Sequence, residues 1–326
     1  MRPGLRLSVT AGLAAALAVA GPPVLAQGTA YPVKPIRMTV ASGAGGGLDF
    51  VARLVATPLT EALGQSVVVD NRAGASGSIA AELAARAAPD GYTLMLLSAS
   101  LVVYGIVTKT PYDLFRDFDT ISLVSASPYI LTVHPSLPVQ SVRDLIAYAK
   151  ANPSKLNFAS TGNASLAHLA GELFAISTAT KLVHVPYKGV GAALTDLLSG
   201  QIQMSFLSGG SVYGQVRNQK LKALAIASTT RAKMAPELPT LIEAGVPGYA
   251  VTQWHGLLAP RGTPRTVIDR LHREIVKAIQ RPEVASRLAI DGTEGIASLP
   301  QEFAAHLRSE RDRWGNVAKA ADIRSN

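Results

Sequence analysis

Three short loops rich in glycine and small hydroxyl residues are the parts of this sequence best suited to bind a ligand. Their sequences are ASGAGGGLD at 41–49, STGNAS at 160–165 and PYKGVG at 186–191. Each loop stands between an apolar, β-prone segment and a segment with helical spacing, so each leaves unpaired backbone N–H groups at the start of a helix. The helix dipole and these N–H groups together favour an anion. The loops therefore predict an anion site built mainly from the main chain.

Other chemistries fit the residues less well. Gly43-Ala-Gly45 is followed by Gly46 and Gly47, so the third glycine of a dinucleotide-binding loop is missing, and no P-loop is present. Hydrolase and zinc-protease motifs such as Gly-x-Ser-x-Gly and His-Glu-x-x-His do not occur. The histidines lack the close spacing of metal ligands; they stand at positions 134, 168, 184, 255, 272 and 306. We expect no cofactor and no metal.

Asp49 closes the first loop, and we expect it to be a structural helix cap that accepts an N–H bond from residue 51 or 52. A single loop of this composition has a purely geometric explanation, because turns between strands and helices often contain Gly and Ser. Three such loops in two α/β halves carry more weight. Ligands of open α/β sheets collect at the carboxyl ends of the strands.

The first 26 residues have the layout of a secretory signal. A basic start is followed by an apolar stretch and by Val24-Leu25-Ala26, which resembles a cleavage site. Export and the complete lack of cysteine agree with a periplasmic location, and a retained N-terminal anchor is the alternative. The formal net charge of +9 comes from scattered Lys and Arg, which favours attraction of small anions, or solubility alone, over binding of nucleic acid.

Strands and helices alternate along the rest of the chain, which predicts an α/β fold with a parallel sheet covered on both faces. Segment 94–107 is interpreted as a strand that enters a loop. The expected strands are 36–40, 66–69, 92–97, 121–125, 129–133, 156–159, 182–185, 202–207 and 221–227, with another from residue 253. The expected helices are 50–63, 79–88, 141–150, 166–176, 192–198, 266–280 and 301–321.

The late return of helices suggests a discontinuous first domain. We expect domain 1 to comprise 27–128 plus 252–326, and domain 2 to comprise 129–251. Two crossings, near 126–132 and 250–256, would then form a hinge. Trp254 lies near the second crossing and is either a reporter of closure or simply a buried aromatic residue.

Several motifs resemble those of a known family. YPVKPIRMTVASGAGGGLDFVARLV, GQSVVVDNRAGASGSIAA and AAPDGYTLML are similar to the start of the tripartite tricarboxylate transporter substrate-binding proteins, the Bug receptors. The similarity continues through FASTGNASLAHLAGELF, VHVPYKGVGAALTDLLSGQIQMSF and GLLAPRGTP. It spans nearly the whole chain after the signal.

The resemblance implies a two-domain, type II periplasmic binding protein that closes on a small organic carboxylate. Such a receptor is monomeric and delivers its ligand to integral membrane transporter subunits, without nucleic acid. In the family, backbone amides and small hydroxyl groups hold the carboxylate. The ligand-binding residues expected here are Ser42, Gly45, Gly46, Gly47, Asp49, Ser98, Thr161, Asn163, Ser165, His168, Tyr187, Gly189 and Ser208.

The chain departs from the family pattern at two places. Ala41-Ser42 stands where members commonly have Pro-Phe, so an aromatic wall is replaced by small residues. Leu207-Ser208 stands where members often have Asp-Asn, so a polar partner for the far end of the ligand is replaced by leucine. We therefore expect a ligand whose far end carries less charge than a tricarboxylate, such as an aromatic or aliphatic monocarboxylate or dicarboxylate.

Two other functions stay open at this point. One is a secreted α/β enzyme in which Ser165 and His168, three residues apart, form an acid–base pair. We find no acidic residue close by in sequence to orient that histidine. The other is a sensor that presents its ligand-loaded form to a signalling partner; it would use the same closed state as a transport receptor.

Overall fold

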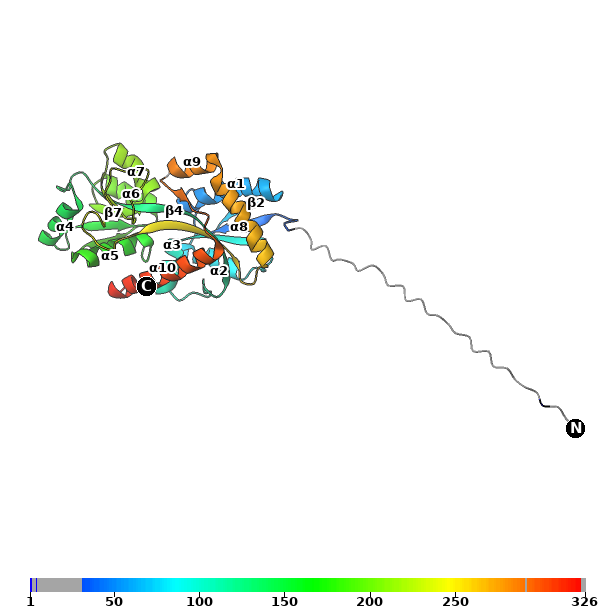
Figure 1. The fold of residues 1–326 in the computed structure, drawn as a ribbon. Helices are drawn as coiled ribbons and strands as arrows, with labels where there is room; N and C mark the ends of the chain where they lie inside the picture. The colour runs from blue at the N-terminus through cyan, green and yellow to red at the C-terminus, as the bar shows by residue number, and fades with distance from the viewer. Residues whose placement is uncertain (2–3, 5–30, 291, 324–326) are drawn as a thin grey trace. The chain divides into compact units, whose positions relative to one another are not determined.

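The computed structural model describes residues 1, 4, 31–290 and 292–323. The expected signal, 1–26, lies outside the described residues apart from Met1 and Gly4. Within the described part of the chain, no helix combines the length and the apolar composition needed to cross a membrane. The described residues from Pro32 onward form one compact unit of mixed strands and helices (Figure 1).

The first sheet carries the first glycine loop. Its order is β2-β1-β3-β9-β4, and β1 runs parallel to both β2 and β3. β9 is antiparallel to β3 and β4, and the short β10 pairs with β4 on the other side. The bounds are β1 Ile36–Val40, β2 Val67–Asn71, β3 Thr93–Ser98, β4 Phe118–Val133, β9 Thr252–Pro260 and β10 Glu294–Gly295.

The second sheet repeats this arrangement and shares β4 with the first. Its order is β6-β5-β7-β4-β8, with β5 parallel to β6 and β7, and β4 antiparallel to β7 and β8. β4 thus occupies in the second sheet the position that β9 occupies in the first. The bounds are β5 Asn157–Ser160, β6 Val183–Pro186, β7 Met204–Ser208 and β8 Lys222–Ile226.

β4 joins the two sheets. It pairs with β9 as far as Pro128, opposite Thr252, and from Tyr129 onward it pairs with β7 and β8. Pro128 has no N–H to donate, and it stands where the strand changes partners. The prediction of separate strands at 121–125 and 129–133 was wrong, because the chain stays extended through Pro128 and forms one 16-residue strand.

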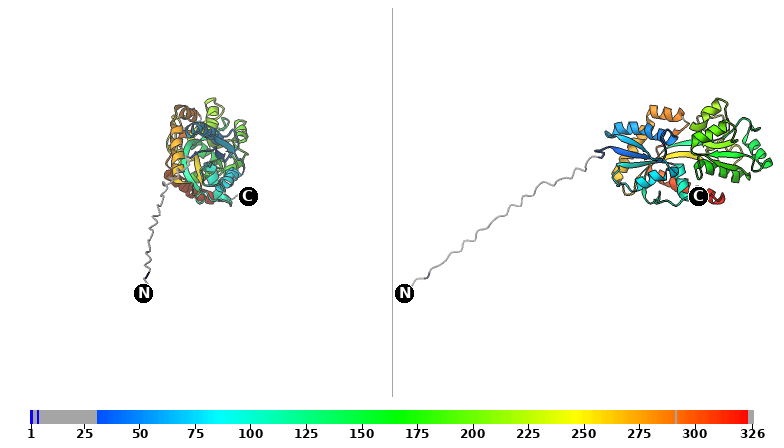
Figure 2. Two further views of the ribbon diagram at one scale, coloured as in Figure 1. Left: turned by 90° about the vertical axis from the view of Figure 1, so that its right-hand side faces the viewer. Right: turned by 180° about the vertical axis from the view of Figure 1, so that it is seen from behind.

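Helices cover both sheets (Figures 1 and 2). On the first sheet α1 packs with α8 and α9, while α2 and α10 pack with α3. α3 and α10 also contact α5, beside the second sheet. The bounds are α1 Gly47–Leu63, α2 Ser78–Ala85, α3 Ala99–Val107, α4 Val142–Ala151, α5 Leu166–Thr178, α6 Val190–Leu198, α7 Gly209–Arg217, α8 Arg265–Gln280, α9 Pro282–Ile290 and α10 Pro300–Ala320.

Periodic burial explains the long helices. In α8 the buried residues Val267, Leu271, Ile275 and Ala278 recur every three or four positions and form one apolar face. α4 begins directly after its N-cap Ser141, whose side chain accepts the Asp144 N–H. The sequence predicted helices over both segments, at 141–150 and 266–280.

Three further expectations differ from the structure. The sheets are mixed, because β4 and β9 run antiparallel to their neighbours at the centre. The loop expected within 94–107 is the helix α3, whose residues Leu101, Val102 and Val103 are buried. α7 and α9 were not predicted: α7 begins with two glycines and α9 with a proline, which hid their short helical patterns.

Candidate functional site

The carboxyl ends of both parallel strand sets lie near the point where β4 and β9 cross between the sheets. Ser98, at the end of β3, pairs in register with His255, and Ser208, at the end of β7, pairs with Tyr129. Thr252 on β9 faces Pro128 on β4. Along the direction of β4, the ends of β3 and β7 are therefore offset by about four residues, roughly 13 Å, and β9 and β4 lie between them. The two strand ends thus flank the segment in which β4 changes partners.

The first glycine loop is fixed by Asp49 from inside the helix it precedes. Gly46 is the N-cap of α1, and Asp49 lies in the first helical turn, 96% buried. Its carboxylate accepts the Gly45 N–H at 2.8 Å, and Arg53 Nε lies 3.0 and 3.1 Å from its two oxygens. The expected cap role of Asp49, with N–H bonds from residue 51 or 52, was wrong. The side chain reaches back to the loop instead.

This geometry determines which backbone groups a ligand can reach. The Gly45 amide is already bonded to Asp49, although we expected it to face the ligand. Gly46 and Gly47 lie at the N-terminus of α1, where first-turn amides have no intrahelical acceptor, and Gly47 is exposed. Ser42 is half-buried, and its carbonyl accepts a bond from the Asn71 side chain.

The charge of Asp49 is held in place by its partners. Burial acts to raise the pKa of this carboxyl, but hydrogen bonds from Arg53, the Gly45 amide and Asn71 outweigh it, so the pKa is lowered. Asp49 is therefore ionised at neutral pH and neutralised by Arg53 within the same helix. Its negative charge is directed at its own loop, and we assign it a structural role there.

A second loop of the first sheet touches the glycine loop and was missed by sequence reasoning. It follows β2, and Gly74, Ala75, Ser76 and Gly77 all have positive φ. Gly77 packs so closely on Ala41 that a side chain there would collide with the Ala41 carbonyl and Cβ. The run Gly-Ala-Ser-Gly was the available signal, since left-handed backbone favours glycine.

In the second sheet, the loop after β5 opens α5. Ser165 is its N-cap and accepts the His168 backbone N–H at 3.2 Å. Thr161 is half-buried and Asn163 is exposed. The His168 ring is buried, and its Nδ1 accepts the Ala164 N–H at 3.2 Å. Ser165 Oγ therefore bonds the backbone of His168 and not its imidazole.

Glu172 corrects a further expectation about this histidine. Its carboxylate lies 3.7 Å from His168 Nε2, one helical turn away, so an acidic group does face the ring. The i, i+4 spacing of His168 and Glu172 was the available signal in the sequence.

The loop after β6 lies beside the loop after β5. The Tyr187 N–H donates to the Ser160 carbonyl at 3.1 Å, which holds the two loops together. The Tyr187 hydroxyl donates to Asp196 at 2.7 Å, and burial together with this carboxylate raises the pKa of Tyr187 to about 12. Gly189 is the N-cap of α6, with φ of 102°. Tyr187 thus has a polar partner of its own within the protein.

Ser208 and Leu207 end β7 with different surroundings. Leu207 is 1% exposed, so its side chain lies in the core and does not replace a polar ligand contact as we expected. Ser208 is half-buried, is the N-cap of α7, and has its Oγ 2.8 Å from Ser211 Oγ. Ser98 holds the matching place before α3. Two small hydroxyl groups therefore stand at helix starts on opposite sides of the crossing.

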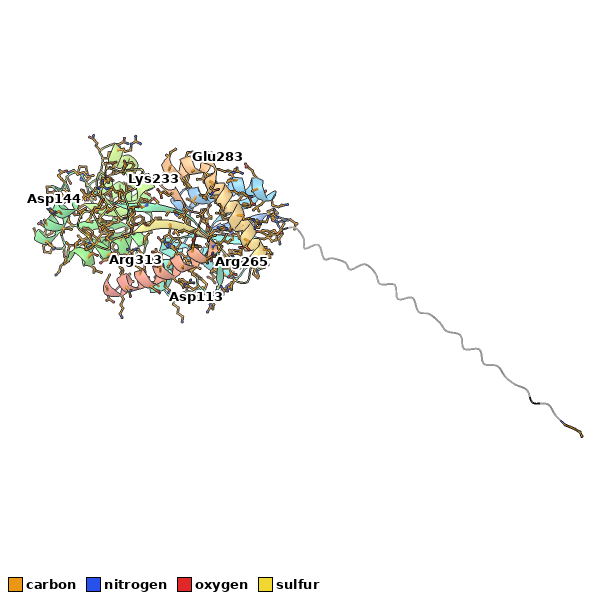
Figure 3. All side chains as sticks on the ribbon, in the orientation of Figure 1. Asp113, Asp144, Lys233, Arg265, Glu283 and Arg313 are labelled. Carbon is orange, nitrogen blue, oxygen red and sulfur yellow. The ribbon has the colours of Figure 1, made fainter. Side chains whose placement is uncertain are left out.

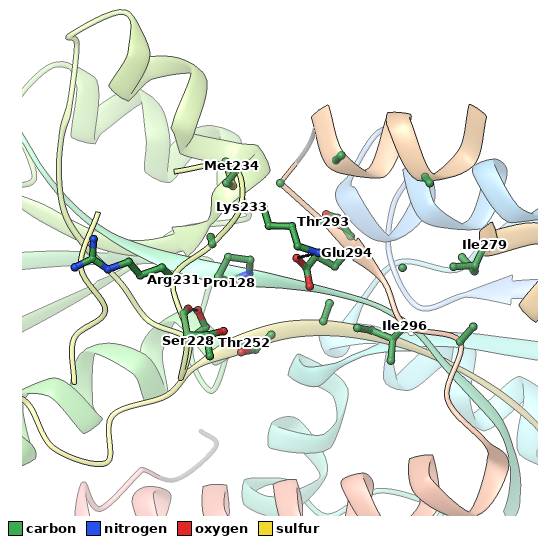
Figure 4. A pocket seen from close by; sticks show the side chains of 18 of the residues that line it. Pro128, Ser228, Arg231, Lys233, Met234, Thr252, Ile279, Thr293, Glu294 and Ile296 are labelled. Carbon is green, nitrogen blue, oxygen red and sulfur yellow. Dashed lines mark hydrogen bonds and ion pairs between the residues drawn. The ribbon is translucent and has the colours of Figure 1, made fainter. Parts of the chain in front are cut away.

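A cavity of about 640 Å³ lies over the crossing strands, and none of the expected site residues lines it. It lies between segments 228–234 and 292–297, with Pro128 and Thr252 in its wall (Figure 4). Lys233 lies 3.4 Å from Glu294 across this cavity. Met234 fills the space between Gly209 and Gly292, where a Cβ would collide with its sulfur.

Asp113, Asp144, Arg265 and Glu283 are exposed around the periphery (Figure 3). Among the described residues, no group of three His, Cys, Asp or Glu is placed to hold a metal ion.

Trp254 is a buried aromatic residue, 1% exposed, next to the crossing on β9. Its indole N–H donates to Glu310 at 2.8 Å, and Trp314 donates to the same oxygen at 2.9 Å. These are the only two tryptophans in the sequence. Both indoles are thus held by one carboxylate of α10.

Comparisons with known proteins agree with this architecture. A family model described as the tripartite tricarboxylate transporter family receptor matches residues 51–323. The chain is 36% identical over 317 residues to the protein BugT of Bordetella pertussis, covering 96% of this chain and 97% of BugT. It is 38% identical over 287 residues to a protein in the tcbD-tcbE intergenic region of Pseudomonas sp. strain P51, covering 87% and 85%.

Solved structures match closely over the same length. Rpa4515 of R. palustris with adipate has a TM-score of 0.83 at 34% identity, covering 90% of this chain and 99% of that one. The periplasmic binding protein BugD has a TM-score of 0.80 at 32% identity, and the match covers 91% of this chain and 100% of BugD. MatC from Rhodopseudomonas palustris with bound malate has a TM-score of 0.78 at 30% identity, covering 88% and 99%. The α/β periplasmic binding protein fold expected from the sequence is thereby confirmed, and the chain belongs to the tripartite tricarboxylate transporter family of receptors.

Proposed function

We propose that this protein is a periplasmic receptor that captures a small organic carboxylate between two domains and delivers it to a tripartite tricarboxylate-type membrane transporter. The observation that carries the proposal is the placement of glycine- and serine-rich helix starts at the carboxyl ends of β1, β3, β5 and β7, all near the crossing of β4 and β9. Related receptors were solved with adipate and with malate, which are both dicarboxylates.

Backbone amides supply the binding energy in this proposal. Gly46 and Gly47 at the start of α1 donate to one side of a carboxylate, while Thr161 and Asn163 before α5 supply donors from the other sheet. Amides at helix starts are oriented before the ligand arrives, so little reorganisation is needed. Ser98 and Ser208 add hydroxyl groups, and Asp49, Ser165 and His168 hold the loops.

The ligand closes the two domains on each other. Domain 1 comprises 27–128 and 252–326, domain 2 comprises 129–251, and the boundaries follow the change of partners along β4 and the start of β9. Two strands connect the domains, so a small twist in each is sufficient for closure. Closure removes water from the amide–carboxylate bonds and strengthens them.

The ligand in this proposal is an aromatic or aliphatic monocarboxylate or dicarboxylate. Ser42 and Ser208 offer small neutral groups at the two departures from the family pattern, and neither brings a positive charge for a third carboxylate. Leu207 plays no part in this choice because it is buried.

An enzymatic role for Ser165 and His168 finds no support in their geometry. A serine nucleophile needs its hydroxyl hydrogen-bonded to the base, whereas Ser165 Oγ accepts a main-chain N–H and the His168 Nδ1 accepts another. We therefore propose a receptor without covalent chemistry. We also propose that it acts as a monomer.

A thermal-shift screen against organic acids tests the proposal. A ligand that binds only the folded state raises the melting temperature by mass action. We expect shifts with dicarboxylates such as adipate or malate and smaller shifts with citrate. A melting temperature unmoved by every organic acid, or a strong response to citrate alone, would contradict the proposed ligand class.

A further inference from the structure

Two stacked histidines stand behind the loop that opens α5. The rings of His168 on α5 and His184 on β6 lie 3.6 Å apart between centroids and are inclined by 8°. The Phe158 ring on β5 lies beside both histidines. Its centroid is 6.3 Å from that of His168 and 5.1 Å from that of His184. The receptor function needs only amides and hydroxyl groups, so it gives no reason for this stack.

Each histidine fixes one difficult backbone position of the loop. Ala164 has a left-handed φ of 54°, and its N–H donates to His168 Nδ1 at 3.2 Å. Gly162 has a φ of 138°, and its N–H donates to Ser160 Oγ at 3.2 Å. Ser160 Oγ in turn lies 2.6 Å from His184 Nε2. The stack therefore holds both positive-φ residues of the loop, one directly and one through Ser160.

The hydrogen bonds also indicate which nitrogen of the His168 ring carries the proton. Because His168 Nδ1 accepts the Ala164 N–H, the proton of the neutral ring sits on Nε2, on the side of Glu172. Burial, and then the neighbouring His168, lower the pKa of His184 to about 3, so His184 is neutral at neutral pH. A neutral ring can stack on His168 without repulsion between two cations.

We propose that His168 and His184 are positioning residues for ligand binding: together they hold loop 161–165 in the conformation that presents Thr161 and Asn163 to the carboxylate, without touching it. This inference rests on the proposed function. If the loop is released, only a fraction of molecules is competent to bind, and the measured Kd rises by the inverse of that fraction.

The test compares two substitutions at one position. His184→Phe keeps an aromatic ring for the stack but loses the contact with Ser160, whereas His184→Gln places an amide near the former Nε2 position. Calorimetry with adipate and malate should show a Kd raised at least tenfold in His184→Phe and within threefold of wild type in His184→Gln. Ser160→Ala should reproduce the loss.

His134→Phe is the matched control. His134 Nδ1 also lies close to a serine hydroxyl, 2.7 Å from Ser136, but it directly follows the far end of β4. Its loss should leave the Kd unchanged even if the melting temperature falls. A wild-type Kd in folded His184→Phe, or equal losses with Phe and Gln, would overturn the proposal.

Amide hydrogen exchange separates this inference from the receptor function. The Gly162 amide should lose protection in His184→Phe and in Ser160→Ala, and should keep it in His184→Gln. This readout needs no ligand. Wild-type protein that binds neither acid would count against the receptor proposal, while unchanged protection of the Gly162 amide would refute the positioning role.

Discussion

The Asp49 carboxylate accepts the Gly45 N–H at 2.8 Å, so a side chain inside α1 holds the loop that precedes the helix. Asp49 stands three positions after the N-cap Gly46, the place from which an acidic side chain reaches back in a capping box. The loop is thereby fixed before any ligand binds.

Replacement of Asp49 should separate the role of its shape from that of its charge. Asp49→Ala removes the acceptor of a buried charge-assisted bond, and we expect a loss of about 2 kcal/mol in unfolding free energy, with at least tenfold weaker carboxylate binding. Asp49→Asn retains an acceptor and should bind within threefold of wild type. Urea unfolding and calorimetry measure both quantities.

Arg53→Ala is the control for that prediction. It removes the ion pair with a largely exposed guanidinium but keeps the Gly45 bond. We expect less than about 1 kcal/mol of destabilisation. Equal loss of affinity in Arg53→Ala and Asp49→Ala would show that the ion pair, and not the bond to Gly45, shapes the loop.

The half-buried His184 and the buried His255 should make the fold sensitive to mild acid. Burial, with repulsion from His168, lowers the pKa of His184 from 6.5 to about 3, and burial lowers that of His255 from 6.5 to about 4. Folding thus favours the neutral rings, whose contribution to stability is complete above pH 6.5 and declines as the pH falls toward 4. The unfolding free energy should decrease between pH 7 and pH 5.

Urea unfolding at several pH values checks this expectation. Above pH 5 the carboxylates stay ionised, so the histidines dominate the pH dependence of the unfolding free energy between pH 7 and pH 5. His255→Asn should make the unfolding free energy depend less on pH. A free energy that is constant or rises between pH 7 and pH 5 would contradict the assignment.

Glu310 should be a stability residue with no role in binding. Its Oε2 accepts both indole N–H groups, from Trp254 and Trp314, and the residue is 8% exposed. Glu310→Ala leaves two buried donors unpaired and should cost about 2–4 kcal/mol, whereas Glu310→Gln keeps an acceptor and should cost less. Denaturant unfolding followed by circular dichroism measures the difference. A changed Kd in Glu310→Gln would place the indoles in the binding region.

Met234 should influence the relation between the proposed domains. Its side chain lies between Gly209 at the start of α7 and Gly292 before β10. Met234→Ala removes this contact, and we expect about 1 kcal/mol of destabilisation and carboxylate binding weakened a few-fold. Lys233→Ala, next to it, loses only an exposed ion pair with Glu294 and should change neither by much. Thermal unfolding and calorimetry should show larger losses of stability and of affinity in Met234→Ala than in Lys233→Ala. Larger losses in Lys233→Ala would contradict the role of Met234.

The sequence predicted elements whose pattern is local. Strand 36–40 and helix 266–280 follow from continuous or periodic apolar residues. The path of β4 could not be predicted, because a proline inside a strand normally ends it, and here partners more than 70 residues away sustain the pairing on both sides of Pro128.

The sequence predicted which loops form the candidate site, but it did not predict the contacts that hold those loops. The three loops do lie at strand ends before helices. The bond from Gly45 to Asp49 and the stack of His168 on His184 arise from tertiary geometry, which spacing does not encode. Leu207 shows the same limit, since both faces of β7 are covered and residues 204–207 are all buried.

A crystal structure of the protein with a bound dicarboxylate such as adipate tests the central claim most directly. We predict one carboxylate within hydrogen-bond distance of the amides at the start of α1 and of donors in loop 161–165, with the ligand chemically intact. A dicarboxylate seated instead in the cavity beside Lys233 and Glu294, or held by one sheet alone, would contradict the account.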